Sequence, residues 1–140
     1  MPVRTAQAEW KGTLKTGSGH MKFADYDGPY TFASRFESGP GTNPEELLGA
    51  AIAGCFSMAL SGDLGDAGHT PGDIRTSAKV TVEPRQGGGF SITKIHLETS
   101  AKVPGIAKDA FLKIADGTKK NCPVSRALQA VPITIDAKLM

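Results

Sequence analysis

The chain has 140 residues, 39% of them hydrophobic and 21% charged, and a formal net charge of +2. This length and composition are typical of one globular domain with its own hydrophobic core, so we expect a single domain over residues 1–140. The small net charge and the scattered basic residues argue against a nucleic-acid-binding or membrane-surface protein. The N-terminal segment lacks the apolar core of a signal peptide, which favours a cytoplasmic location.

The first 37 residues have the alternating apolar and polar pattern of β-strands, in three segments that begin at Ala6, Met21 and Tyr30. Glycine, serine and proline gather between these segments and indicate turns at residues 16–19 and 26–29. We therefore expect a three-stranded antiparallel meander. In its third strand, over residues 30–37, Arg35 is expected on the face opposite Phe32 and Phe36.

The segment that follows predicts a helix from Pro44 that ends by Gly68. Asn43 suits the N-cap, Pro44 the first helical position, and Glu46 the third position of a capping box. The next residues, up to Leu60, are apolar around the whole circumference, which predicts a buried helix. The apolar run is shorter than the ~18 residues of a membrane span, so no membrane partner is expected. One small sheet is not expected to cover such a helix on every side, and we infer an obligate homodimer.

The rest of the chain predicts a strand, a partner strand, an amphipathic helix, a short helix and a closing strand, at residues 74–82, 90–101, 107–116, 121–129 and 131–137. The phase of the partner strand slips between Ile92 and Ile95, which predicts a β-bulge. The order βββ–α–ββ–αα–β indicates an α+β fold, with antiparallel sheets around a buried central helix.

The two cysteines, Cys55 and Cys122, are the candidates for chemistry. Cys55 lies in the apolar helix about 16 Å from its start, where burial raises the pKa of a thiol and the helix dipole is too distant to lower it. A reactive Cys55 therefore needs a cation from elsewhere. Cys122 lies at the start of the short helix, where backbone N–H groups stabilise a thiolate. The local sequence leaves open which thiol attacks first, and both residues also suit plain packing roles.

The candidates for that cation are arginines: Arg4, Arg35, Arg75, Arg85 and Arg126. Arg126 lies four residues after Cys122 on the same helix face, and Arg35 lies shortly before the loop into the central helix. Either is also consistent with an exposed surface charge. Glu45, in the first helical turn, suits the helix dipole and can also hold a guanidinium through both carboxylate oxygens. No metal or cofactor is expected, because no nucleotide-binding fingerprint is present and the histidines lack metal-ligand spacing: His20, His69 and His96.

The motif GTNPEELLGAAIAGCFSMAL at residues 41–60, followed by NCPVSRAL at residues 121–128, resembles the OsmC/Ohr family of osmotically inducible and organic hydroperoxide resistance proteins. The likeness extends from AEWKGTLKTG near the N-terminus to the final strand. The segment SRFESGPGTNPEELLGAA resembles the OsmC branch more than the Ohr branch. The resemblance implies a swapped, intertwined homodimer with two active sites at the subunit interface.

The resemblance further implies a thiol-dependent peroxidase that reduces organic hydroperoxides. It implies that Cys55 is peroxidatic and Cys122 resolving, that Arg35 stabilises the thiolate and that Glu45 orients the arginine. The expected cycle passes through a Cys55 sulfenic acid and a Cys55–Cys122 disulfide, which an external dithiol of lipoyl or other small type reopens. The apolar helix favours alkyl or fatty-acid hydroperoxides over hydrogen peroxide. The alternative is a non-enzymatic dimer, either a redox sensor or an apolar-ligand-binding protein.

Overall fold

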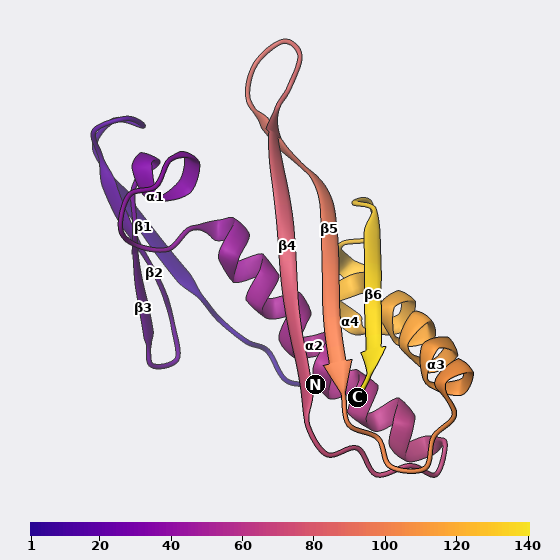
Figure 1. Cartoon of the computed structure of the whole chain (residues 1–140). Coiled ribbons are helices and arrows are strands. Elements are labelled where there is room, and N and C mark those ends of the chain that lie inside the picture. The colour runs from indigo at the N-terminus through magenta and orange to yellow at the C-terminus, as the bar shows by residue number, and fades with distance from the viewer. The chain divides into compact units, whose positions relative to one another are not determined.

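The computed structural model describes all 140 residues and divides into two compact units, residues 1–47 and residues 48–140 (Figure 1). Each unit has its own three-stranded sheet. The expected single domain over the whole chain stays a prediction.

The first unit contains the predicted antiparallel meander. Its strands are β1 (Gln7–Lys11), β2 (Ser18–Phe23) and β3 (Tyr26–Tyr30), in the order β1-β2-β3. Both pairings are antiparallel, as predicted. The third strand was predicted over residues 30–37, but β3 already ends at Tyr30. The residues predicted as the second turn belong to β3, because the turn lies at Ala24 and Asp25 and Ala24 has a φ of 46°.

The segment predicted as the third strand is the short helix α1 (Phe32–Phe36). A capping box starts it, because the Thr31 side chain accepts a hydrogen bond from the Ser34 backbone N–H at 3.1 Å and Ser34 Oγ accepts one from the Thr31 N–H at 2.8 Å. The prediction that Arg35 and Phe36 lie on opposite strand faces is therefore wrong. The Arg35 guanidinium lies 5.0 Å from the centre of the Phe36 ring.

The central helix α2 (Pro44–Asp66) begins as predicted. Asn43 Oδ1 accepts a hydrogen bond from the Glu46 backbone N–H at 2.8 Å. The reciprocal half of the expected capping box is replaced by another contact, since the Glu46 carboxylate accepts from Thr42 Oγ1 at 3.1 Å. The helix ends ahead of Gly68, whose φ of 87° suits glycine and stops the helical path.

The second unit contains β4 (Ile74–Pro84), β5 (Phe90–Ala101) and β6 (Ile133–Leu139) in that order. Strands β4 and β5 are antiparallel, and their register shifts so that Thr93 is the extra residue of the predicted bulge. Strand β6 is parallel to β5, as the arrows in Figure 1 show, so the prediction of antiparallel sheets is wrong for this pair. The helices between the two strands provide the long crossover that a parallel pair requires.

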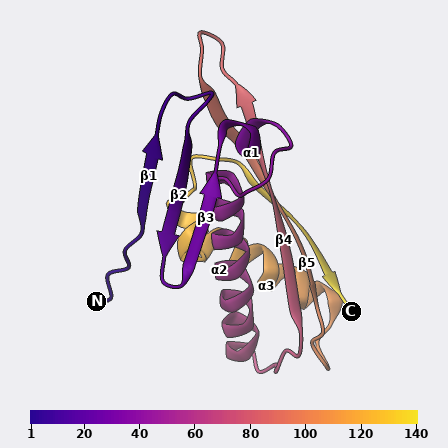
Figure 2. The ribbon, with the colours of Figure 1, turned by 90° about the vertical axis from the view of Figure 1, so that its left-hand side faces the viewer.

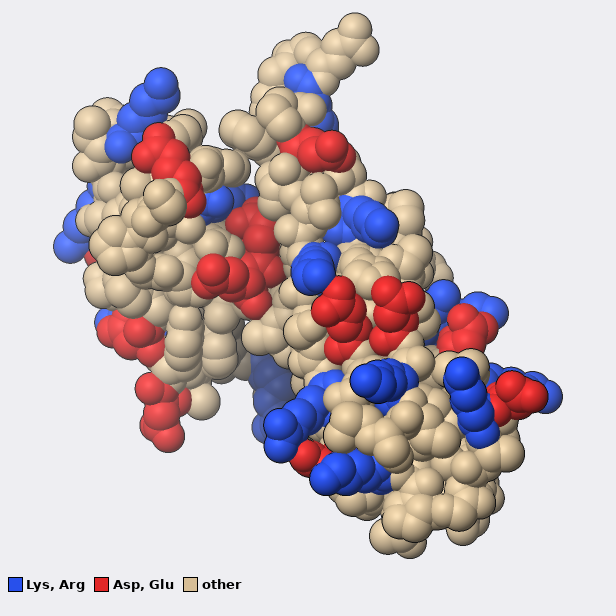
Figure 3. Space-filling model, viewed as in Figure 1, with Lys and Arg blue, Asp and Glu red and all other residues tan.

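Those helices are α3 (Lys108–Asn121) and α4 (Pro123–Ala127). Helices α2 and α3 lie on the same side of the β4–β5–β6 sheet (Figures 1 and 2), and a shared core joins them to it. The fully buried apolar residues of α2 recur at helical spacing: Ile52, Phe56, Leu60 and Leu64. The outer face of the sheet carries interspersed charges of both signs (Figure 3), from Arg75, Lys79, Lys94, Glu98, Asp136 and Lys138.

The other side of α2 is exposed in the single chain. Ala51 and Gly54 are exposed, and Met58 has 82% of its surface accessible. The chain alone thus leaves one side of the helix uncovered, although the whole helix was predicted to be buried. The helix also has 23 residues and a mean hydropathy of 1.5 over its most apolar window, of which 28% is buried, so the estimate that it is too short to cross a membrane is wrong. Core helices of soluble proteins meet the same criterion.

Candidate functional site

Cys122 occupies the junction between α3 and α4. It is at once the C-cap of α3 and the N-cap of α4, and its backbone N–H donates to the Thr118 carbonyl at 2.9 Å. Pro123 is the first residue of α4. A backbone N–H at that position has no partner within the helix, so proline costs no hydrogen bond there. The Cys122 side chain is 2% exposed. The expected helix start at this cysteine is confirmed.

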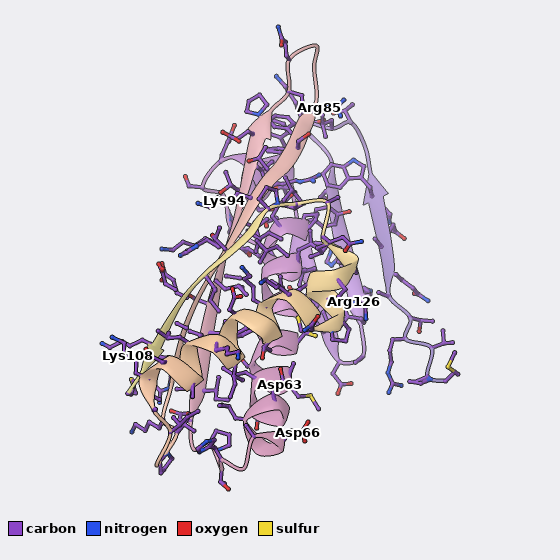
Figure 4. The ribbon with its side chains drawn as sticks, turned by 90° about the vertical axis from the view of Figure 1, so that its right-hand side faces the viewer. Asp63, Asp66, Arg85, Lys94, Lys108 and Arg126 are labelled. Atoms are coloured by element: carbon purple, nitrogen blue, oxygen red, sulfur yellow. The ribbon has the colours of Figure 1, made fainter.

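Thr118 also fastens the last turn of α3 to α2. Its hydroxyl donates to Asp63 Oδ2 at 2.5 Å, and Asp63 lies near the C-terminal end of α2 (Figure 4). Thr118 itself is 1% exposed. The segment that carries Cys122 is therefore bound to the helix that carries Cys55.

Cys55 lies on the partly exposed side of α2 and packs against the core cluster that contains Cys122. Burial is the largest influence on its thiol and raises the pKa of Cys55. The hydrogen bond to the backbone N–H of Val124 lowers this pKa, and the neighbouring Cys122 thiol raises it further. The structure thus brings together the two cysteines that the sequence singled out.

Val124 and Ser125, which follow Cys122 in α4, contact these sulfurs. The sequence analysis predicted neither contact. Val124 presents its backbone N–H to Cys55, and Ser125 presents both its hydroxyl and its N–H to Cys122. Ser125 Oγ lies 3.0 Å from Cys122 Sγ, and the Ser125 N–H donates to that sulfur at 3.4 Å. For Ser125 the sequence did carry a signal, because a residue three positions after an N-cap lies close enough to contact the N-cap side chain.

In the first unit, Arg35 and Glu45 form the pair that the family resemblance implied. Arg35 Nε donates to the two carboxylate oxygens at 3.1 and 3.2 Å, and Nη2 donates to Oε1 at 2.7 Å. The Glu45 side chain is 9% exposed, whereas the Arg35 side chain is 36% exposed. A buried carboxylate that binds two nitrogens of one guanidinium holds that group in a single orientation.

The other arginine and glutamate candidates are placed differently. Arg126 is exposed on α4 (Figure 4), and its side chain makes no ion pair or hydrogen bond. Glu46 is exposed and binds the Thr42 hydroxyl instead of an arginine. The structure therefore describes two built pairs, Arg35 with Glu45 in residues 1–47 and Cys55 with Cys122 in residues 48–140.

The family model of OsmC-like proteins matches residues 37–136 of this sequence. The chain belongs to the OsmC-like family. It is 47% identical to the peroxiredoxin OsmC of Escherichia coli (strain K12) over 139 residues, which cover 97% of this chain and 96% of that protein. It is 33% identical to an organic hydroperoxide resistance protein of Xanthomonas axonopodis pv. citri (strain 306) over 90 residues, 64% of this chain and 61% of that protein. The expected family and the greater likeness to the OsmC branch are confirmed.

Solved structures of the OsmC-like family share the fold. An OsmC-like protein from Mycoplasma pneumoniae superposes with a TM-score of 0.77 at 16% identity, over 99% of this chain and 98% of that one. The organic hydroperoxide resistance protein OhrB of Bacillus subtilis gives a TM-score of 0.67 at 22% identity, over 97% and 98%. At these identities the likeness concerns the fold alone, and it confirms the α+β class.

Proposed function

We propose that this OsmC-like protein is a cysteine-based peroxidase that reduces organic hydroperoxides to alcohols. The observation that carries the proposal is the contact between two free thiols, one partly exposed on α2 and one held at the α3–α4 junction. A relative 47% identical over nearly the whole chain bears the name peroxiredoxin, and a more distant one the name organic hydroperoxide resistance protein.

The first step is attack by the Cys55 thiolate on the terminal oxygen of the hydroperoxide. The O–O bond breaks, the alkoxide leaves and takes up a proton to form the alcohol, and Cys55 becomes a sulfenic acid. Burial raises the pKa of the Cys55 thiol and so opposes this step. We assign the compensating positive charge to Arg35, which Glu45 holds in one orientation.

The second step closes a disulfide. The Cys122 sulfur attacks the Cys55 sulfenic acid, an S–S bond forms, and the hydroxyl leaves as water, which protects Cys55 from further oxidation. An external dithiol of lipoyl or other small type then reopens the bridge by thiol–disulfide exchange and is itself oxidised. A reducing compartment suits such a cycle, and we propose a cytoplasmic location.

Turnover separates this proposal from its alternatives. With tert-butyl hydroperoxide and dithiothreitol both in excess, we expect each protein molecule to consume many equivalents of hydroperoxide. A redox sensor without reductive recycling would stop after one equivalent, and a ligand-binding protein would consume none. Hydrogen peroxide under matched conditions is expected to react more slowly, because the helix that carries Cys55 is apolar. Equal rates with the two oxidants would contradict that preference.

We further propose that a second copy of the chain covers the exposed side of α2, giving a homodimer. Burying an unpaired charge costs several kcal/mol, so Met58→Arg is expected to convert a wild-type dimer into monomers. Size-exclusion chromatography with light scattering measures this change. Leu112→Arg is the matched control, since Leu112 is 36% exposed but lies on α3, and it is expected to stay dimeric. A monomeric wild type, or a dimeric Met58→Arg variant, would contradict the proposal.

A further inference from the structure

The hydroxyl of Ser125 has a single hydrogen-bond partner, the sulfur of Cys122. Ser125 is 3% exposed, and its Oγ lies 3.0 Å from Cys122 Sγ. Sulfur is a weak partner for a buried hydroxyl, and a small apolar side chain would fill this position without the desolvation penalty. The fold alone therefore gives no reason for a serine here.

Helix α1 shows what a serine in the same position ordinarily does. Ser34, like Ser125, lies three residues after an N-cap, and its hydroxyl accepts the N-cap backbone N–H and donates to the Thr42 carbonyl at 2.8 Å. In α4 the N-cap N–H is already bound to the Thr118 carbonyl, because Cys122 also ends α3. The Ser125 hydroxyl therefore does not bind the N-cap N–H, and its partner is the Cys122 sulfur.

The two sulfurs differ in access, and Ser125 gives Cys122 two hydrogen-bond donors. Within the chain Cys55 is partly exposed, whereas Cys122 is 2% exposed. A thiolate at Cys122 accepts hydrogen bonds from the Ser125 hydroxyl at 3.0 Å and from the Ser125 N–H at 3.4 Å. In thiol–disulfide exchange the accessible sulfur is attacked, and the buried sulfur leaves faster when its thiolate is stabilised.

We infer that Ser125 is a positioning residue that makes Cys122 the leaving thiolate, so that the reducing dithiol attacks the sulfur of Cys55. This inference rests on the proposed function. One thiolate of the dithiol forms an S–S bond with Cys55, the Cys55–Cys122 bond breaks, and Cys122 departs as a thiolate stabilised by the Ser125 hydroxyl and N–H. The second thiolate of the dithiol then closes its own ring disulfide and releases the Cys55 thiolate, so the protein gains the two electrons that the dithiol loses.

The first test maps the attacked sulfur in the wild-type protein. The disulfide form, made with one equivalent of tert-butyl hydroperoxide, is treated briefly with 2-mercaptoethanol, and free thiols are then blocked with N-ethylmaleimide. Peptide mass spectrometry is expected to find the mercaptoethanol adduct on Cys55 and the maleimide on Cys122. The reverse pattern would overturn the inference, and this result does not depend on any variant.

The second test removes the hydroxyl. In Ser125→Ala, reopening of the disulfide by dithiothreitol is expected to slow about threefold to tenfold, because one hydrogen bond to the departing thiolate is lost. A larger share of the mercaptoethanol adduct is then expected on Cys122. Ser125→Thr keeps the hydroxyl and is expected to restore most of the rate. The matched control is Ser57→Ala, which removes a half-buried hydroxyl that donates to Thr76 Oγ1 at 2.8 Å and touches no sulfur.

Failure of the inference and failure of the proposed function give different results. If one equivalent of hydroperoxide forms no Cys55–Cys122 disulfide in the wild type, the proposed cycle itself is wrong. If the disulfide forms but Ser125→Ala reopens at the wild-type rate with the wild-type adduct pattern, only the role of Ser125 is overturned. Equal slowing in Ser125→Ala and Ser125→Thr would also overturn it, since the cause would then be packing rather than the hydroxyl.

Discussion

Replacement of Cys55 with serine is expected to reduce hydroperoxide consumption to the rate measured without protein. A serine hydroxyl has nearly the volume of the thiol, but it is not ionised at neutral pH and forms no sulfenic acid. Cys55 is the more accessible of the two thiols and lies on the partly exposed side of α2. The measurement is consumption of tert-butyl hydroperoxide with dithiothreitol present.

Cys122→Ser is the matched control for this prediction, because it removes the second thiol of the same pair. Without dithiol, it is expected to form the Cys55 sulfenic acid at the wild-type rate. Each further hydroperoxide molecule then adds one more oxygen atom at Cys55, up to three in the intact mass spectrum, and no disulfide forms. If Cys122→Ser failed in this first reaction while Cys55→Ser survived it, the peroxidatic and resolving roles would be reversed.

Replacement of Arg35 with methionine is expected to lower the rate at which Cys55 attacks the hydroperoxide about 10- to 100-fold. This range corresponds to the free energy of one hydrogen bond from a charged donor. Burial raises the pKa of Cys55, and without the guanidinium nothing assigned to the site opposes that shift except the Val124 N–H. Because the thiolate is the reacting form, the higher pKa lowers the rate at neutral pH and leaves the rate at high pH unchanged. Iodoacetamide alkylation followed against pH, in a Cys122→Ser background, is expected to show its midpoint displaced to higher pH.

Arg126→Met is the control for the arginine prediction. Arg126 is exposed and unpaired, although it is four residues from Cys122 in the sequence. We expect its loss to change the alkylation profile and the peroxide rate by less than about twofold. A larger loss in Arg126→Met than in Arg35→Met would transfer the cationic role to Arg126. Circular dichroism of both variants checks that folding is retained, since Arg35→Met leaves the Glu45 carboxylate without its partner.

The elements predicted well are those whose signals are local. The start of α2 follows from Asn43, Pro44 and Glu46, and the Asn43 hydrogen bond to the Glu46 N–H is present. Strand β5 has the predicted bounds, and the slip in its phase is the bulge at Thr93. In each case the deciding residues lie within a few positions of one another.

The errors arise where a local pattern has two interpretations or where the outcome depends on distant residues. The alternation around Phe32 and Phe36 also suits a single helical turn, and the spacing of Thr31 and Ser34 was the cue for it. The direction of β6 depends on the crossover through α3 and α4, which no pattern within the strand encodes.

The candidate site was predicted in part. Glu45 was correctly paired with an arginine, because a carboxylate in the first helical turn can accept a guanidinium bidentately, as it does with Arg35. The contact between Cys55 and Cys122 joins distant segments, and only the family resemblance indicated it. The role inferred for Ser125 was not predictable, because it depends on where α3 ends relative to α4.

The hydrogen bond from Thr118 to Asp63 joins the end of α3, beside Cys122, to the helix that carries Cys55. In the proposed cycle, the resolving sulfur is therefore present at a high effective concentration beside the sulfenic acid, and disulfide closure is a unimolecular step. A second hydroperoxide molecule has to reach Cys55 by diffusion, at a rate proportional to its concentration. Closure of the bridge therefore outruns over-oxidation until the hydroperoxide is abundant, and the margin depends on how firmly these two helices are held together.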